Sequence, residues 1–138
     1  MNLTTKGRYA VMAMTELALR KDDEAAVSLH AIAEAQEIPR NYLEQLFAHL
    51  RSSGMVSSTR GAQGGYRLNI APKDIAILDV IKAAEESITI TRCSGAERGC
   101  MKHSARCLTH DLWAGLEDQI SSYLSSVSLQ DVCDGKIS

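Results

Sequence analysis

Two short amphipathic segments, joined by a tight turn and followed by a glycine-rich hairpin, constrain the fold of this chain most. The second segment carries apolar residues at i, i+3, i+4 and i+7, the spacing of one helix face: Leu43, Leu46, Phe47 and Leu50. Ser28 is a suitable N-cap for the first segment, which ends near Gln36. Pro39 favours a helix start and keeps Ile38 extended, so a turn at Glu37 and Ile38 separates the two helices. The pattern predicts a helix-turn-helix.

A hairpin follows directly. Gly54 ends the second helix, and two alternating runs, 55–59 and 66–69, are separated by a glycine-bearing loop that begins at Arg60. This order of elements describes a winged helix-turn-helix, in which the second helix enters the major groove of DNA and the hairpin flanks the duplex. The predicted fold class is therefore mainly α, with a small two-stranded wing.

Three further helical patterns surround this unit. Residues from about 4 to 20 indicate a largely buried helix, and a fourth helix is expected from about 72 to 85. A fifth helix, from about 109 to 127, carries an apolar stripe: Leu112, Leu116, Ile120, Leu124 and Val127. Ser128 is placed to cap one last turn. A small winged domain has little core left to cover so long a fifth helix, which predicts that this C-terminal helix dimerises with a second copy.

The length of 138 residues suits one domain with an appended element. We expect a winged helix-turn-helix DNA-binding domain at 1–84, a cysteine-bearing cluster-binding loop at 85–108, and the dimerisation helix with its short C-terminal turn at 109–138.

Any DNA binding must come from a local basic patch, because the formal net charge is -2. Between Arg40 and Ile70 there are four arginines and one glutamate, a local charge of +3. The candidate DNA-binding residues lie on the second helix and the wing: Arg40, Asn41, Glu44, Gln45, Arg51, Arg60, Gln63 and Gly64. An alternative is that these are the solvated faces of an ordinary helix and hairpin.

Each of these residue types has a chemical reason to be there. Asn41 and Gln45 can bond adenine edges bidentately, arginines read guanine or hold phosphates, and Glu44 can accept from a cytosine amino group. At the wing tip, Arg60 can reach the minor groove or a phosphate, and glycines let the backbone approach the sugar-phosphate chain closely.

Four soft or borderline metal ligands stand in one short polar stretch: Cys93-x6-Cys100-x6-Cys107-x2-His110. Three thiolates and one imidazole are a complete set for a 2Fe-2S cluster and equally for tetrahedral zinc, and the sequence does not separate the two. Surface thiols are the plain alternative. His103 is a substitute ligand, and Cys133 is expected to pack in the last turn.

Other classes of protein are disfavoured. No apolar run approaches the ~18 residues of a membrane span, and the first residues lack the core of a signal peptide, so we expect a cytoplasmic protein without a membrane partner. Cysteines clustered in that compartment more often bind metal than form disulfides. No nucleophile and base stand at a motif spacing, and a fully ligated metal leaves no open position for catalysis, which argues against an enzyme.

Five stretches carry a specific resemblance that spans nearly the whole chain: residues 1–10 (MNLTTKGRYA), 42–47 (YLEQLF), 56–58 (VSS), 64–68 (GGYRL) and 107–110 (CLTH). Together they resemble the family of the iron-sulfur cluster regulator IscR, among the winged-helix repressors. The chain departs from that family in its x6 intervals, each one residue wider than is typical, and at Ala62 and Gln63, where proline and glycine are usual in the wing.

The resemblance implies a homodimeric transcription factor that binds double-stranded operator DNA at two half-sites. It implies one 2Fe-2S cluster per subunit, bound by Cys93, Cys100, Cys107 and His110, and control of iron-sulfur assembly genes, as a repressor. Arg40, Glu44, Gln45 and the wing around Arg60 would then face DNA. A regulator that responds to nitric oxide or iron through the same centre, and a zinc-stabilised DNA-binding module without sensing, remain as alternatives.

Overall fold

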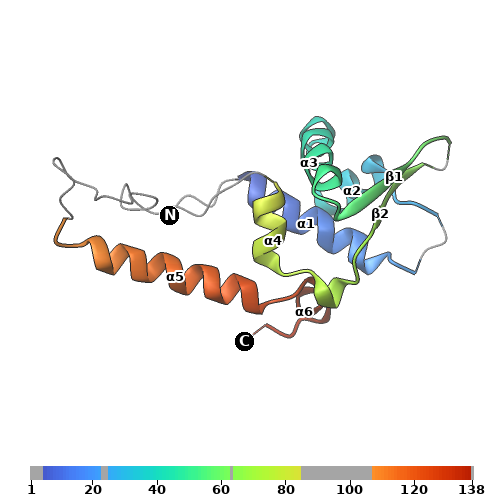
Figure 1. The fold of residues 1–138 in the computed structure, drawn as a ribbon. Helices are drawn as coiled ribbons and strands as arrows, with labels where there is room; N and C mark the ends of the chain where they lie inside the picture. Colours follow the sequence, from blue (N-terminus) through green and yellow to red (C-terminus); the bar gives the residue numbers. More distant parts are fainter. Residues whose placement is uncertain (1–4, 23–24, 63, 85–106, 138) are drawn as a thin grey trace.

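The protein is described by a computed structural model that covers residues 5–22, 25–62, 64–84 and 107–137. Its described part is mainly helical, with a two-stranded antiparallel sheet, which confirms the predicted fold class. The elements, in chain order, are α1 (Thr5–Leu19), α2 (Leu29–Gln36), α3 (Arg40–Ser52), β1 (Val56–Thr59), β2 (Gly65–Leu68), the 3-10 helix η1 (Pro72–Asp74), α4 (Ile77–Ala83), α5 (His110–Ser126) and α6 (Leu129–Asp134) (Figure 1).

The helix-turn-helix forms as the sequence predicts. The Ser28 side chain accepts a hydrogen bond from the backbone N–H of Ala31 at 3.1 Å and so caps α2. At the other end of α2, Glu37 adopts the left-handed conformation, with φ 54° and ψ 48°. Pro39 was expected at the first helical position of α3. It instead occupies the N-cap position, and the helix begins one residue later, at Arg40. The two helices are therefore joined by a turn of three residues, 37–39.

The core lies where α3 packs against α1 and α4. The four periodic residues of α3 are each at most 1% exposed, which confirms the face predicted from their spacing (Leu43, Leu46, Phe47 and Leu50). The buried face of α1 consists of small and flexible apolar residues: Ala10, Ala13, Met14, Leu17 and Ala18. Leu19, the last residue of α1, is 59% exposed because it lies on the opposite face of that helix.

The wing is held against the segment that leads into α2. Strands β1 and β2 pair with Val56 opposite Leu68 and Thr59 opposite Gly65, and an isolated bridge joins Val27 to Tyr66. A Cβ atom on Gly65 would lie 2.2 Å from the carbonyl oxygen of Val27, so this position requires glycine for packing within the protein. The base of the wing is thus fixed next to the start of α2.

The fourth predicted helix is wrong in one detail, because the structure divides it. A 3-10 turn at 72–74 is separated from α4 by Ile75 and Ala76, which are extended. These two residues pair with the chain between α5 and α6: Ala76 bridges Ser128, and the backbone N–H of Leu129 donates to the carbonyl oxygen of Ile75 at 2.8 Å. Backbone bonds to a distant segment therefore replace the bonds of a continuous helix.

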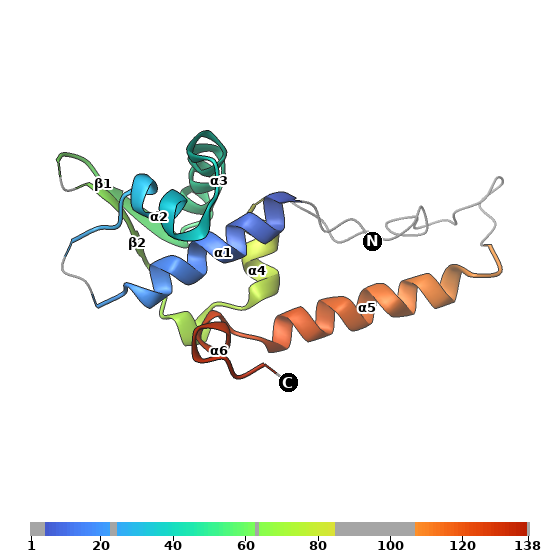
Figure 2. The same cartoon turned by 180° about the vertical axis from the view of Figure 1, so that it is seen from behind.

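The C-terminal helices are anchored at one end only. Ser128 and Asp131 form a capping box at the start of α6, as the predicted Ser128 cap requires. Leu129 is completely buried and places α6 against α1. Helix α5 leads away from this anchor, and its His110 end is the end farther from the winged unit (Figures 1 and 2).

Candidate nucleic-acid interface and metal centre

Helix α3 has two chemically distinct faces. All five of its predicted DNA-binding side chains are exposed, whereas the apolar face is buried: Arg40, Asn41, Glu44, Gln45 and Arg51. Hydrogen-bonding and charged groups are thus presented to solvent from a helix whose position the core fixes. This arrangement suits the reading of base edges.

The wing lies beside α3 and is tied to it by a side-chain contact. Arg51 Nη1 lies 3.4 Å from Ser58 Oγ of β1, to which it can donate. Arg60 is exposed in the loop between the strands, and Gln63 lies outside the described residues. At Gly64 a Cβ atom would lie 2.3 Å from the carbonyl oxygen of Thr59, so the turn of the wing itself demands glycine there.

Two of the four predicted metal ligands lie within the described residues, at the start of α5. The backbone N–H of His110 donates to the carbonyl oxygen of Cys107 at 3.1 Å. Cys107 Sγ also lies 3.5 Å from Thr109 Oγ1, which accepts from Trp113 Nε1 at 3.1 Å. Cys93, Cys100 and the substitute ligand His103 lie outside the described residues.

The chemistry of this pair fits a 2Fe-2S cluster or zinc. A thiol and an imidazole stand three residues apart, and the positive end of the α5 dipole favours a thiolate. His110 is 8% exposed and is the one buried residue of α5, which is unusual for a histidine at a helix start. Among the described residues, no three His, Cys, Asp or Glu side chains gather closely enough to hold a metal ion.

Cys133 has a different environment. It is half-buried on α6, packed against the core, and its Sγ lies 3.9 Å from the carbonyl oxygen of Thr15 on α1. Burial, with a contribution from the neighbouring charge of Asp134, raises the pKa of this thiol. The 17 residues of α5, about 25 Å of helix, separate it along the chain from His110. Cys133 therefore packs as the sequence predicts.

The outer part of α5 carries large apolar side chains that the described chain does not cover. Leu112 and Leu116 are 62% and 43% exposed. Towards the anchored end of the helix, Leu124 packs against the core, while its neighbour Tyr123 is 46% exposed. The stripe predicted from the sequence is thus divided between an anchored end and an exposed stretch.

One buried polar group escaped the sequence analysis. Glu16 is 8% exposed on α1 and accepts hydrogen bonds from Arg20 and from Gln36 of α2. A single carboxylate among Ala13, Met14, Leu17 and Ala18 was the available signal, since charged residues are buried only when they are paired.

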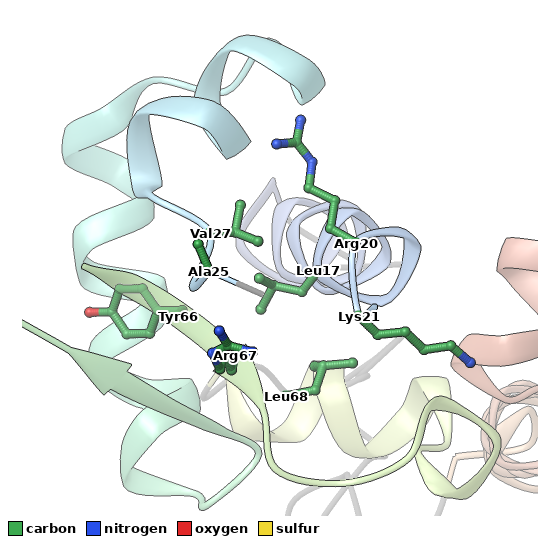
Figure 3. Close-up of a pocket in the computed structure, with 8 residues that line it drawn as sticks. All are labelled: Leu17, Arg20, Lys21, Ala25, Val27, Tyr66, Arg67 and Leu68. Atoms are coloured by element: carbon green, nitrogen blue, oxygen red, sulfur yellow. The ribbon is translucent and has the colours of Figure 1, made fainter. Parts of the chain in front are cut away.

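A cavity of about 90 Å³ lies between the end of α1 and β2. Leu17, Val27 and Leu68 contribute apolar surface to it, and the charged ends of Arg20 and Lys21 point in different directions (Figure 3). Arg20 reaches Glu16 and Lys21 reaches Gln130. This cavity has room for about three water molecules and does not suit a nucleotide effector.

Comparison with known proteins gives a consistent result. The Rrf2 family model, described as an iron-dependent transcriptional regulator, matches residues 3–135. The HTH-type transcriptional regulator IscR of Aliivibrio salmonicida (strain LFI1238) is 50% identical over 132 residues, which cover 96% of this chain and 77% of the relative.

Two solved structures share the fold along almost all of the chain. IscR of T. potens is 37% identical with a TM-score of 0.77, over 98% of this chain and 88% of that one. CymR, the global cysteine regulator of B. subtilis, is 32% identical with a TM-score of 0.81, over 99% and 98%. In the part of the chain that the structure describes, no helix is long and apolar enough to cross a membrane.

Proposed function

Because this chain belongs to the Rrf2 family of DNA-binding transcriptional regulators, which are not enzymes, we propose that it senses iron-sulfur cluster status through a 2Fe-2S centre. In this proposal it is a cytoplasmic homodimer that represses the genes of iron-sulfur cluster assembly. The relatives that bear the name IscR support this choice among the members of the family.

The observation that carries the proposal is the placement of Cys107 and His110. They stand three residues apart at the start of α5, and the same helix exposes apolar side chains along its outer part. A cluster bound by these two residues would be attached directly to the helix that forms the proposed subunit interface. Cys93 and Cys100 would complete the ligand set.

The DNA-binding surface in this proposal consists of α3 and the wing. Asn41 and Gln45 would read base edges, Glu44 would discriminate between bases, and arginines would hold phosphates or guanines. Arg40, Arg51 and Arg60 supply that positive charge, with Gln63 and Gly64 at the tip of the wing. Residues 1–84 form the DNA-binding unit of the proposal.

Dimerisation supplies two such units. Burial of Leu112, Leu116 and Tyr123 against the same helix of a second copy would remove exposed apolar surface and fix the separation of two operator half-sites. Residues 109–138 would provide this interface, and residues 85–108 would hold the cluster beside it.

The proposed switch requires two states that differ in DNA affinity. When bound, the cluster supplies an oxidation-sensitive cross-link between the 85–108 segment and the first turn of α5. This chain contributes Cys107 and His110 to that link and anchors the far end of α5 through the bonds between 75–77 and 127–129. A coupling of about 1–3 kcal/mol between cluster and DNA would be ordinary for such a regulator.

The decisive experiment combines chemical analysis with DNA selection. The protein would be purified anaerobically, its visible absorption recorded, and its iron, sulfide and zinc measured. A randomised duplex pool would then be selected with cluster-loaded and cluster-free protein. We expect a coloured protein with about two irons and two sulfides per chain. A colourless zinc protein that selects DNA would instead identify a zinc-stabilised DNA-binding module, and selection of no duplex would refute DNA reading by α3.

A further inference from the structure

The turn between α2 and α3 fixes the direction of the recognition helix with few residues. Residues 37–39 connect the helices, and Glu37 has φ 54°, a conformation that residues other than glycine adopt reluctantly. Both Glu37 and Ile38 direct their backbone N–H groups to the carbonyl oxygen of Ala33. The geometry at the last turn of α2 therefore determines where α3 begins.

A buried carboxylate on α1 holds that last turn. Glu16 Oε1 accepts a hydrogen bond from Gln36 Nε2 at 2.9 Å, and Oε2 accepts from Arg20 Nε at 2.5 Å. Gln36 is the final residue of α2, immediately before the left-handed Glu37. We call Glu16, Arg20 and Gln36 the Glu16 clasp.

We propose that Glu16 is a positioning residue for DNA recognition, which fixes the end of α2 through Gln36 and thereby the direction in which α3 presents its polar face. The inference rests on the proposed role of α3 as the recognition helix. Glu16 itself is 8% exposed, whereas Asn41, Glu44 and Gln45 are exposed, so the clasp acts from beneath the DNA-reading surface.

Directional bonding explains why a charged group is used here. Apolar packing between α1 and α2 is less directional than hydrogen bonding, and buried ion pairs contribute little net stability compared with apolar side chains. The hydrogen bond from Arg20 holds the carboxylate in place at the end of α1, and the hydrogen bond from Gln36 then sets the distance and direction between that carboxylate and the end of α2. The hydrogen bonds and the charge of Arg20 outweigh the opposing effect of burial and keep the pKa of Glu16 below its usual range, so the carboxylate is charged at neutral pH.

Loss of the clasp should affect specific DNA binding more than non-specific binding. Base contacts need side chains within hydrogen-bond reach of particular edges, whereas phosphate contacts tolerate small shifts of the helix. A merely structural residue would lower the unfolding temperature without changing the ratio of the two affinities in the folded protein.

The test compares three variants of the full chain. Glu16→Gln replaces one accepting oxygen by an NH2 group. The exchange variant, Glu16→Gln with Gln36→Glu, restores the bond with its polarity reversed. Glu34→Gln is the matched control, since Glu34 is an exposed glutamate on α2 whose partner is His30 at 3.3 Å. The probes are a duplex selected by the wild-type protein from a randomised pool and a scrambled duplex of the same composition.

Affinities are measured by fluorescence anisotropy below the unfolding transition of every variant. The ratio of interest is the affinity for the selected duplex divided by the affinity for the scrambled duplex. We expect Glu16→Gln to lower this ratio about tenfold, the exchange variant to recover most of the loss, and Glu34→Gln to leave the ratio unchanged. If Glu16→Gln does not fold, Gln36→Ala, which keeps the Arg20 ion pair, takes its place with the same expectation.

An unchanged ratio in folded Glu16→Gln, or a folded exchange variant that recovers nothing, would overturn the positioning role while leaving DNA binding intact. Failure of the wild-type protein to select any duplex would refute the proposed function of α3, and the inference with it.

Discussion

The backbone N–H of His110 donates to the carbonyl oxygen of Cys107 at 3.1 Å, which brings a thiol-bearing and an imidazole-bearing residue together at one end of α5. Local helix geometry is enough to hold these two residues close, whatever path the preceding chain takes. The widened x6 intervals therefore leave the spacing of Cys107 and His110 unchanged and bear only on how Cys93 and Cys100 would reach this pair. A cluster that uses all four residues would join the preceding segment to a preformed pair of ligands.

Cys107 and Cys133 should respond differently to substitution. Cys107→Ser is expected to abolish the visible absorption of the anaerobically purified protein, because it removes a proposed ligand from the start of α5. Cys133→Ser is expected to keep that absorption, since its thiol packs against α1 and burial raises its pKa. Iron and sulfide content per chain, measured on both variants, would check this. Loss of iron from Cys133→Ser alone would reverse the assignment of these two residues.

Glu44 is expected to restrict the range of operators. A carboxylate that faces DNA must find a donor such as a cytosine amino group or suffer repulsion from phosphates. Glu44→Ala should therefore broaden the selected sequences at one or two positions, with a loss of about 1–3 kcal/mol of discrimination there. Parallel selections from a randomised pool with the wild type and Glu44→Ala would measure this loss of discrimination. Glu34→Ala on α2 is the control for loss of an exposed acid. Identical selected sequences would remove Glu44 from the reading surface.

Helix periodicity predicted α1 and α3 because each of these helices buries one regular face in the same core. The spacing of Leu43, Leu46, Phe47 and Leu50 was sufficient to place α3, and Ser28 and Ser128 marked the starts of α2 and α6. The break between η1 and α4 was not predictable in this way. It depends on backbone pairing of Ala76 with Ser128, which lies far along the chain and leaves no local pattern.

The candidate site was predictable to the extent that residue type reveals chemistry. Amides and arginines on one face of α3, and a cysteine three residues before a histidine, have side chains suited to DNA and to metal, and this can be recognised without knowledge of the fold. The role of Gly65 was not predictable, because its missing side chain makes room for the carbonyl oxygen of Val27 and not for DNA. Gln36 likewise gave no sign that it would meet Glu16, twenty residues earlier in the chain.

The exposed stretch of α5 should control the oligomeric state. Leu116→Lys would place a charge within the proposed interface and is expected to convert the proposed dimer to a monomer, because an unpaired buried ammonium group is strongly destabilising. Sedimentation velocity would measure the change. Ser125→Lys, at an exposed polar position nine residues later and so on the opposite side of the same helix, adds the same charge and should leave the dimer intact. A dimeric Leu116→Lys protein would place the interface elsewhere.

Glu37 should tolerate glycine better than any bulkier residue. It is the one non-glycine residue with positive φ among those that the structure describes, and it is exposed. Glu37→Gly relieves backbone strain of about 1–2 kcal/mol but gives the unfolded chain more freedom, so the net change is expected to be a stabilisation of up to about 1 kcal/mol. Glu37→Val, β-branched at the same position, should destabilise by a similar amount or more. The free energies of unfolding of both variants, measured in urea, would show whether the left-handed turn persists in solution.

The Glu16 clasp should give folding stability a characteristic dependence on pH. The pKa of Glu16 is lowered in the folded protein, so its contribution is fully present above the unfolded-state pKa of about 4.3 and is lost as the pH falls through the folded-state value. At neutral pH, Glu16→Gln is therefore expected to be less stable than the wild type by about 1–3 kcal/mol. The difference should narrow as the pH falls below about 4, because protonation then removes the same charge from the wild type. Urea unfolding of both proteins at a series of pH values would measure the gap, and a gap that stayed constant into acid would show that the charge of Glu16 does not contribute to stability.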